Sequence, residues 1–179
     1  MRSKFDPQKH NRRSIRIPGY DYSQPGAYFV TIVTYQRECL FGNVIDGEMR
    51  LNENGKIVDH AWHDLPNHYP NLELGTYIIM PNHFHGIIIL NDTVGAGLRP
   101  APTKPQKRHG LPEIVRALKS FSARRINERL KSPGTPIWQR NYYDHIIQND
   151  REWNNIHLYI ESNPLNWATD EENPICHAQ

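Results

Sequence analysis

The sequence predicts an α+β fold in which helices pack on an antiparallel sheet. Two apolar runs, residues 72–80 and 83–90, are separated only by a Pro-Asn break, which is typical of two neighbouring strands joined by a tight connection. Segments with helical periodicity precede and follow this pair. The 179 residues are enough for one domain with a single core.

The first half of the chain contains a strand, a hairpin and a helix. Residues 27–35 include Val, Ile and Thr, which favour a strand. Residues 44–51 are expected to form a hairpin that turns at Asp46 and Gly47, because Asp-Gly is a strong signal for a two-residue turn. A helix is expected from Glu53 to about Tyr69.

The second half adds the two apolar strands and two further helices. Residues 111–131 place Ile114, Ala117, Leu118 and Phe121 on one helical face. Residues 137–147 include a strand. The last helix, 150–163, begins with a capping-box pattern at Asn149 and Glu152. Helices interleaved with a central pair of strands indicate an antiparallel sandwich of ferredoxin-like type.

The chain divides into a basic N-terminal lead (1–20), a single domain (21–167) with a Pro/Gly-rich loop at 91–111, and a C-terminal tail (168–179). The net charge is only +2, but residues 99–131 carry ten Lys and Arg against two acids, whereas residues 144–172 carry seven acids against Arg151. No apolar run approaches a membrane span, and the two cysteines match no zinc or redox spacing. We therefore expect a cytoplasmic protein with no membrane association.

The most informative stretch is His83-Phe84-His85, at the start of the second apolar strand. Alternate residues of a strand share a face, so both imidazoles project to one side while Phe84 points to the other. Two histidines held side by side are a ready pair of metal ligands, but most divalent ions need a further protein ligand. The alternative is that one histidine packs in the core and the other forms a hydrogen bond.

The last helix supplies candidates to complete such a site. Trp153, Ile156 and Ile160 form an apolar stripe, and Tyr159 and Asn163 stand four residues apart on its shoulder. Because Pro164 disfavours helix at Asn163, this pair occupies the last turn. A phenol and a carboxamide at the edge of a packed face can both point at the sheet, although both could instead be surface groups.

Three ordered segments together resemble the single-tyrosine HUH transposases, and most closely the REP-associated tyrosine transposases of bacteria. The segments are Met80-Pro-Asn-His-Phe-His-Gly86, Ile137-Trp-Gln-Arg-Asn-Tyr-Tyr-Asp-His-Ile-Ile147 and Tyr159-Ile-Glu-Ser-Asn-Pro164. The resemblance extends from about Gly19 to Trp167. It implies a ferredoxin-like HUH nuclease domain in a bacterial cytoplasmic protein, acting as a monomer or homodimer.

The resemblance also implies an activity and the residues that perform it. His83 and His85 would bind a divalent cation, Mg²⁺ or Mn²⁺, and Asn163 would complete its ligands, where better-known insertion-sequence members have Gln. Tyr159 would attack single-stranded or hairpin DNA to give a 5′-phosphotyrosine, allowing the enzyme to nick and rejoin palindromic hairpin repeats. A bound cation suits this chemistry because it polarises and positions the phosphate.

Residues that could contact DNA lie elsewhere in the sequence. The basic positions Arg12, Arg13, Lys107, Arg108, Arg124 and Arg125 could follow a phosphate backbone, and Trp138, Arg140 and Tyr142 could stack on unpaired bases. Trp138 could equally belong to the core. Tyr142 and Tyr143 are rival nucleophiles, but neither has a ligand-type residue one helical turn away.

Two other functions remain open at this point. One is a hairpin-binding protein that has lost catalysis, and the other is an unrelated metal hydrolase that activates water at His83 and His85. A covalent protein–DNA adduct is expected for the transposase chemistry alone.

Overall fold

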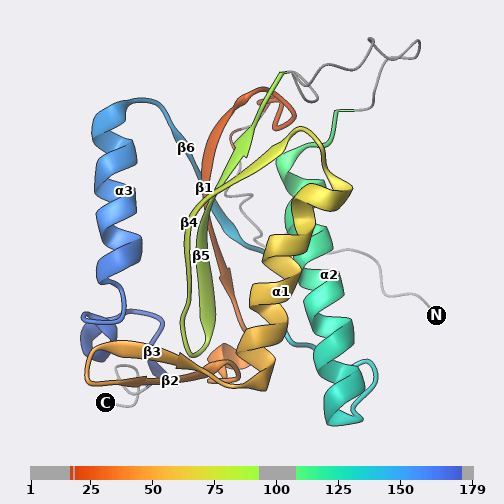
Figure 1. Cartoon of the computed structure of the whole chain (residues 1–179), viewed down its shortest axis with the longest axis vertical. Coiled ribbons are helices and arrows are strands. Elements are labelled where there is room, and N and C mark those ends of the chain that lie inside the picture. The colour runs from red at the N-terminus through yellow and green to blue at the C-terminus, as the bar shows by residue number, and fades with distance from the viewer. Residues whose placement is uncertain (1–16, 18, 93–107, 175–179) are drawn as a thin grey trace, which may run out of the picture.

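The computed structural model describes residues 17, 19–92 and 108–174 (Figure 1). In chain order, the elements are β1 (Gly26–Val33), the 3₁₀ turn η1 (Tyr35–Arg37), β2 (Gly42–Ile45), β3 (Glu48–Leu51), α1 (Glu53–His68), β4 (Leu72–Ile79), β5 (His83–Leu90), α2 (Leu111–Leu130), β6 (Tyr143–Ile147), α3 (Asp150–Ser162) and the 3₁₀ turn η2 (Trp167–Thr169).

Four strands form one antiparallel sheet in the order β4-β5-β1-β6. Helices α1 and α2 cover one face of this sheet, and α3 covers the other (Figure 1). The strand order, with α1 and α2 connecting the strands on one face, is the ferredoxin-like arrangement, so the α+β fold expected from the sequence is confirmed.

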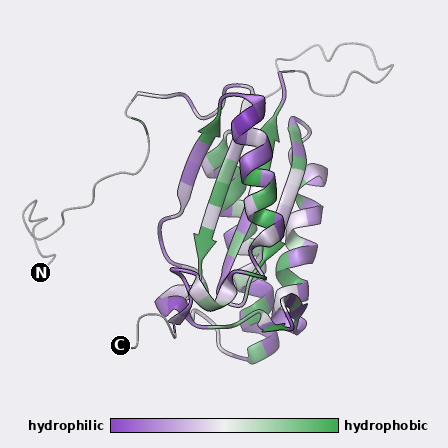
Figure 2. Ribbon diagram, turned by 90° about the vertical axis from the view of Figure 1, so that its left-hand side faces the viewer, coloured by the Kyte–Doolittle hydropathy of each residue, from purple (hydrophilic) through white to green (hydrophobic). Residues whose placement is uncertain are grey.

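Each face of the sheet has its own apolar core. The larger core lies between the sheet and α1 and α2, where Phe84 packs on Trp62 with ring centroids 4.9 Å apart. The smaller core joins Phe29 and Ile87 of the sheet to Ile160 of α3. In Figure 2, α3 lies in front of a sheet whose strands are rich in hydrophobic residues. The alternation of β5 therefore sends His83 and His85 to the α3 side.

The local signals predicted most elements closely. The turn between β2 and β3 has positive φ at both Asp46 (53°) and Gly47 (75°), as a type I′ hairpin requires. Helix α1 begins after Asn52, whose side chain accepts hydrogen bonds from the backbone N–H groups of Asn54 and Gly55.

The first strand is shorter than expected, ending at Val33 rather than Tyr35. After Thr34 the chain enters η1, where Gln36 and Arg37 both have positive φ (55° and 57°), which no strand can accommodate. In the segment before β6, Trp138 forms an isolated bridge with Thr34, and Ile137 and Trp138 pack in the larger core.

Residues 1–16, 18, 93–107 and 175–179 lie outside the described part of the chain, and these include most of the basic lead and most of the 91–111 loop. Among the helices that the structure describes, none is long and apolar enough to cross a membrane.

Candidate active site

His83 and His85 lie side by side at the start of β5, with ring centroids 4.5 Å apart. Both side chains are buried, at 0% and 3% exposure. The register of the sheet places Thr31 of β1 directly opposite His85, and the Thr31 Oγ1 lies 2.8 Å from Nδ1 of that imidazole. Nδ1 of His83 lies 3.0 Å from Oδ1 of Asn82. Each ring is thus held through Nδ1, which leaves Nε2 as the outward nitrogen.

Burial keeps both imidazoles neutral at physiological pH. It lowers the pKa of His83 from 6.5 to about 4, although the nearby carboxylate of Asp170 and the carboxamide of Asn163 partly oppose the shift. Burial, and then the neighbouring His83, lower the pKa of His85 well below its usual value. A neutral imidazole retains a lone pair, so both side chains can bind a metal without first losing a proton.

Helix α3 positions the tyrosine above this pair. Its N-cap is Asn149, whose Oδ1 accepts a hydrogen bond from the backbone N–H of Glu152 at 2.9 Å. The Glu152 carboxylate accepts from the backbone N–H of Gln148 at 3.0 Å, a variant of the predicted capping box. The apolar stripe of α3 packs on the sheet, and His157 contacts Thr76 of β4 at 2.5 Å between Nδ1 and Oγ1.

The Tyr159 hydroxyl lies 3.4 Å from Nε2 of His85. Its ring meets that imidazole at 5.2 Å and Phe29 at 6.1 Å, both between centroids, so its direction is fixed from two sides. The side chain is still 45% exposed. Partial burial and then the carboxylate of Asp170 raise its pKa, with Asn163 opposing. In this state the phenol therefore retains its proton, and a positive charge nearby would be needed to favour the phenolate.

Asn163 caps α3 at its C-terminus and is almost fully buried, at 1% exposure. Its Nδ2 donates a long hydrogen bond of 3.4 Å to Asp170. Among the residues that the structure describes, neither its Oδ1 nor the buried Nε2 of His83 has a hydrogen-bond partner. Two buried atoms with free lone pairs are uncommon and call for an explanation, such as a cation that accepts both.

These side chains border a pocket of about 600 Å³. Its wall includes His85, Tyr159 and Asn163, together with Tyr143 and the acidic run 170–172. Among the described residues, no three His, Cys, Asp or Glu side chains converge as a metal-binding cluster, and the buried side chain of Asn163 lines the same pocket as His85. The rival tyrosine Tyr143 shares this pocket.

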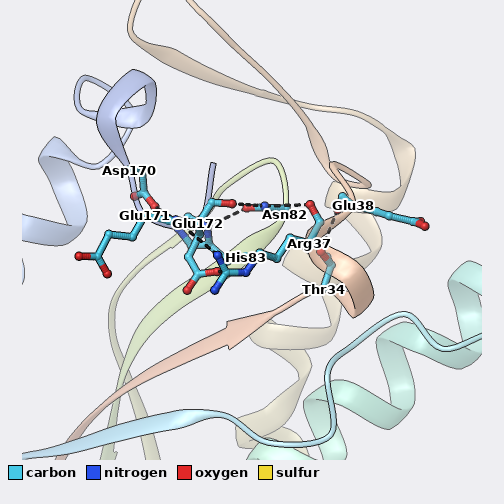
Figure 3. A network of polar contacts seen from close by, with 8 residues as sticks. All are labelled: Thr34, Arg37, Glu38, Asn82, His83, Asp170, Glu171 and Glu172. Carbon is cyan, nitrogen blue, oxygen red and sulfur yellow. Dashed lines mark hydrogen bonds and ion pairs between the residues drawn. The ribbon is translucent and has the colours of Figure 1, made fainter. Parts of the chain in front are cut away.

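Residues 170–173 return to the site, which the sequence did not indicate. The Arg37 guanidinium pairs with the Glu172 carboxylate at 3.2 Å and donates to the backbone carbonyl of Glu171 at 3.1 Å. Asn82 donates to the carbonyl of Glu172 (Figure 3). Part of the expected tail therefore lies against the histidine pair, and it brings Asp170 close enough to influence both His83 and Tyr159 electrostatically.

No family model matches the chain. A Haemophilus influenzae protein that is uncharacterised is 38% identical over 180 aligned residues, which cover 96% of this chain and 98% of the relative. A second protein of that organism, provisionally named a REP-associated tyrosine transposase, is 30% identical over 147 residues, covering 81% of this chain and 73% of the relative. The chain belongs to the REP-associated tyrosine transposases.

A solved structure of a REP-associated tyrosine transposase bound to a REP hairpin has the same fold, with a TM-score of 0.59 at 19% identity. The similarity covers 84% of this chain and 73% of that one. The family resemblance identified from the three sequence segments is thus confirmed.

Those predicted basic DNA contacts that the structure describes do not gather at this pocket. Arg124 and Arg125 lie on α2, on the opposite face of the sheet from α3 (Figure 1). Arg108 is paired with Asp92 at 3.1 Å. Arg140 and Tyr142 border a separate hollow beside α2. Because consecutive residues point to opposite faces, Tyr142 and Tyr143 open onto different sides of the sheet.

Three predicted DNA contacts, Arg12, Arg13 and Lys107, lie outside the described residues. Their role stays a prediction.

Trp138 needs a correction. Its indole is only 7% exposed, packs against Phe41 at 4.9 Å between centroids, and donates a hydrogen bond to Ser122 at 2.9 Å. A side chain with both its face and its N–H engaged cannot stack on a base without unpacking the core. The alternative interpretation, that Trp138 is a core residue, is therefore the one that the structure favours.

Two residues that contact the imidazoles were missed from the sequence. Thr31 could be recognised only from the strand register, because it is 54 positions from His85. Asn82 was interpreted only as part of the Pro-Asn break, although its position next to His83 was a signal that it could orient that ring.

Proposed function

We propose that this transposase nicks and rejoins single-stranded DNA at hairpin repeats through a covalent bond between Tyr159 and a 5′-phosphate. The observation that carries the proposal is that His85, Tyr159 and Asn163 line one pocket, with the ring of His83 packed directly against that of His85. A half-exposed nucleophile beside a buried pair of neutral imidazoles suits the transfer of a phosphate diester to a side chain.

The residues present fit a divalent cation. Among the described residues, Nε2 of His83 and Oδ1 of Asn163 are buried without hydrogen-bond partners, and Nε2 of His85 lies 3.4 Å from the Tyr159 hydroxyl. Two nitrogens and an oxygen are a donor set that Mn²⁺ accepts, whereas Mg²⁺ prefers oxygen ligands. When bound, the cation would polarise the phosphate and favour the phenolate of Tyr159.

The acidic wall of the pocket strengthens the case for a cation. Asp170, Glu171 and Glu172 would repel a phosphodiester that approaches Tyr159. They also oppose ionisation of the phenol. Both effects would be reversed by a divalent positive charge at the histidines, so we expect cleavage to require metal.

In the proposed phosphoryl transfer, one bond to phosphorus forms as another breaks, and every proton is accounted for. The phenolate oxygen of Tyr159 attacks phosphorus, and the bond from phosphorus to the 3′ oxygen breaks. The phenol proton passes to water or to a carboxylate of the pocket, and the departing 3′ oxygen takes up a proton to become a free hydroxyl. The phosphotyrosine keeps an ester bond, so a 3′-hydroxyl can attack it and rejoin DNA without ATP.

Two observations support the proposed substrate class, namely the position of Tyr159 and the solved relative that is bound to a REP hairpin. Tyr159 is anchored on a helix that packs tightly on the sheet, so its hydroxyl cannot enter a stacked duplex without distorting it. We propose that the protein binds a DNA hairpin and cuts a short unpaired stretch beside the stem.

The test is a denaturing-gel assay for a covalent adduct. Purified protein is incubated with a labelled hairpin that has a single-stranded flank, in Mn²⁺, Mg²⁺ or chelator, and a full duplex of the same sequence is the competitor. We expect an adduct with the hairpin in metal only. Tyr159→Phe should abolish it while hairpin binding persists, and the matched variant Tyr143→Phe should retain it.

The outcomes separate the candidate functions. An adduct formed by Tyr159→Phe but lost in Tyr143→Phe would move the nucleophile to Tyr143. Hairpin binding without any adduct or cleavage would indicate a hairpin-binding protein that has lost catalysis. Metal-dependent cleavage without an adduct, at equal rates on hairpin and duplex, would indicate a hydrolase that uses water.

A further inference from the structure

We propose that Asn82 is a positioning residue that fixes the tautomer of His83, so that the lone pair of Nε2 faces the metal position. We further infer that residues 170–173 help to hold Asn82 in this orientation and are not a free tail. The inference deepens the proposed function and rests on it only in naming a metal as the ligand of Nε2.

The orientation of the Asn82 carboxamide is set by its surroundings. Its nitrogen Nδ2 lies 3.0 Å from the carbonyl oxygen of Arg37 and 2.6 Å from that of Glu172 (Figure 3). Carbonyl oxygens only accept hydrogen bonds, so the group facing them must be the NH₂. The Oδ1 atom is then necessarily the group that faces Nδ1 of His83, at 3.0 Å.

This arrangement determines where the imidazole carries its proton. An amide oxygen cannot donate, so the contact is a hydrogen bond only if Nδ1 of His83 bears the hydrogen. In a neutral ring Nε2 is then unprotonated. That atom is buried and has no hydrogen-bond partner within the part of the chain that the structure describes, as a nitrogen reserved for a cation would be.

His85 lacks this constraint. Its Nδ1 lies 2.8 Å from the hydroxyl of Thr31, which can donate as well as accept. The hydroxyl contact is therefore compatible with either tautomer of His85. Asn82 therefore restricts His83 to one tautomer, whereas Thr31 does not restrict His85 in this way.

Asn82 is itself held on every side. It is fully buried, and its backbone carbonyl accepts a hydrogen bond from the N–H of Thr34 at 2.8 Å. The left-handed backbone of Arg37 belongs to the same turn that offers its carbonyl to Asn82. The Arg37 guanidinium also holds residues 170–173 in place, because it donates to the backbone carbonyl of Glu171 and pairs with the Glu172 carboxylate. Residues 170–173 thus supply one of the two acceptors that fix the carboxamide.

The direct test is nitrogen-15 NMR of the imidazole rings in the metal-free protein at neutral pH. The two ring nitrogens have distinct chemical shifts when one carries hydrogen and the other a lone pair. We expect the signal of His83 to show a protonated Nδ1 and an unprotonated Nε2. In Asn82→Leu, which has a similar volume and no polar atoms, the ring should move toward the other tautomer or a mixture.

Metal affinity provides the second measurement. Mn²⁺ binding, followed by electron paramagnetic resonance, should weaken about ten- to a hundredfold in Asn82→Leu. Asn82→Asp keeps an oxygen acceptor but loses the NH₂, so it should retain the tautomer while loosening residues 170–173. The matched control is Asn71→Leu, because Asn71 is also a buried asparagine bonded to a carbonyl, that of His109, near the far end of the sheet. It should lose stability without altering the His83 tautomer or Mn²⁺ binding.

The results discriminate the inference from the proposed function. A wild-type His83 protonated at Nε2 would overturn the role of Asn82, even in a protein that cleaves DNA, and this measurement needs no folded variant. The expected tautomer in a protein that binds no Mn²⁺ would refute the metal role while leaving the control by Asn82 in place. An unchanged tautomer in folded Asn82→Leu would also overturn the inference.

Discussion

Acid should destabilise this protein through its buried histidines. In the unfolded chain His83 takes up a proton with a pKa near 6.5, whereas in the folded protein burial lowers that pKa to about 4. Between these values the unfolded state binds more protons than the folded state, so stability falls as pH falls. The stabilisation is complete above about pH 6.5 and is lost progressively toward about pH 4.

The size of the effect follows from the shift. A difference of about 2.5 in pKa corresponds to roughly 3 kcal/mol, since each pKa unit is worth about 1.4 kcal/mol. The pKa of His85 is also lowered, by burial and then by the neighbouring His83, so this histidine acts in the same direction. A loss of this size is a large part of the free energy of unfolding of a typical domain, about 5–15 kcal/mol.

The assay is urea unfolding of the metal-free protein between pH 7.5 and about 4.5. Wild type is compared with His83→Gln, which removes the titrating group while the carboxylates titrate in both proteins. The difference in unfolding free energy should be constant above about pH 6.5, and below it should shift in favour of the variant by about 2 kcal/mol or more. His60→Gln is the matched control, because an exposed histidine on α1 is hydrated in the folded and unfolded chain alike.

A difference that stays flat to pH 4.5 would refute the reasoning, because it would mean that His83 takes up its proton equally in both states. Saturating Mn²⁺ offers a second check, since a metal that binds only the folded state stabilises it and competes with protons for the rings. The acid transition should then move to lower pH.

The other predictions concern single side chains. Asn163→Ala should weaken Mn²⁺ binding about ten- to a hundredfold, measured by paramagnetic resonance, and unchanged affinity would exclude its amide oxygen as a ligand. Ile160→Ala should cost about 2–5 kcal/mol in urea unfolding and lower the cleavage rate, because the residue is fully buried where α3 docks on the sheet. Trp138→Ala should cost about 3–5 kcal/mol, whereas a base-stacking surface residue would leave stability nearly unchanged. Arg140→Glu should weaken hairpin binding and reduce its salt slope by about one, and a parallel salt dependence would exclude a phosphate contact.

Local patterns in the sequence were sufficient to predict the elements, and they indicated four candidate residues for the site whose roles stay predictions. The alternation of a strand sends His83 and His85 to one face, and helical spacing aligns Tyr159 with Asn163. The Asp46-Gly47 turn and the caps at Asn52 and Asn149 involve residues only a few positions apart, so they can be predicted before the fold is known.

Contacts between distant segments were decided by the tertiary structure alone. Thr31 meets His85 through the register of β1 on β5, and residues 170–173 reach Asn82 across 90 positions. Whether Trp138 faces a base or Phe41 depends on how the segment before β6 lies against the core. Neither periodicity nor composition encodes such pairings, because they depend on how the surfaces of several elements fit once all of them are packed. The sequence by itself therefore determined which groups are available for the chemistry, and the tertiary structure decided how those groups are oriented.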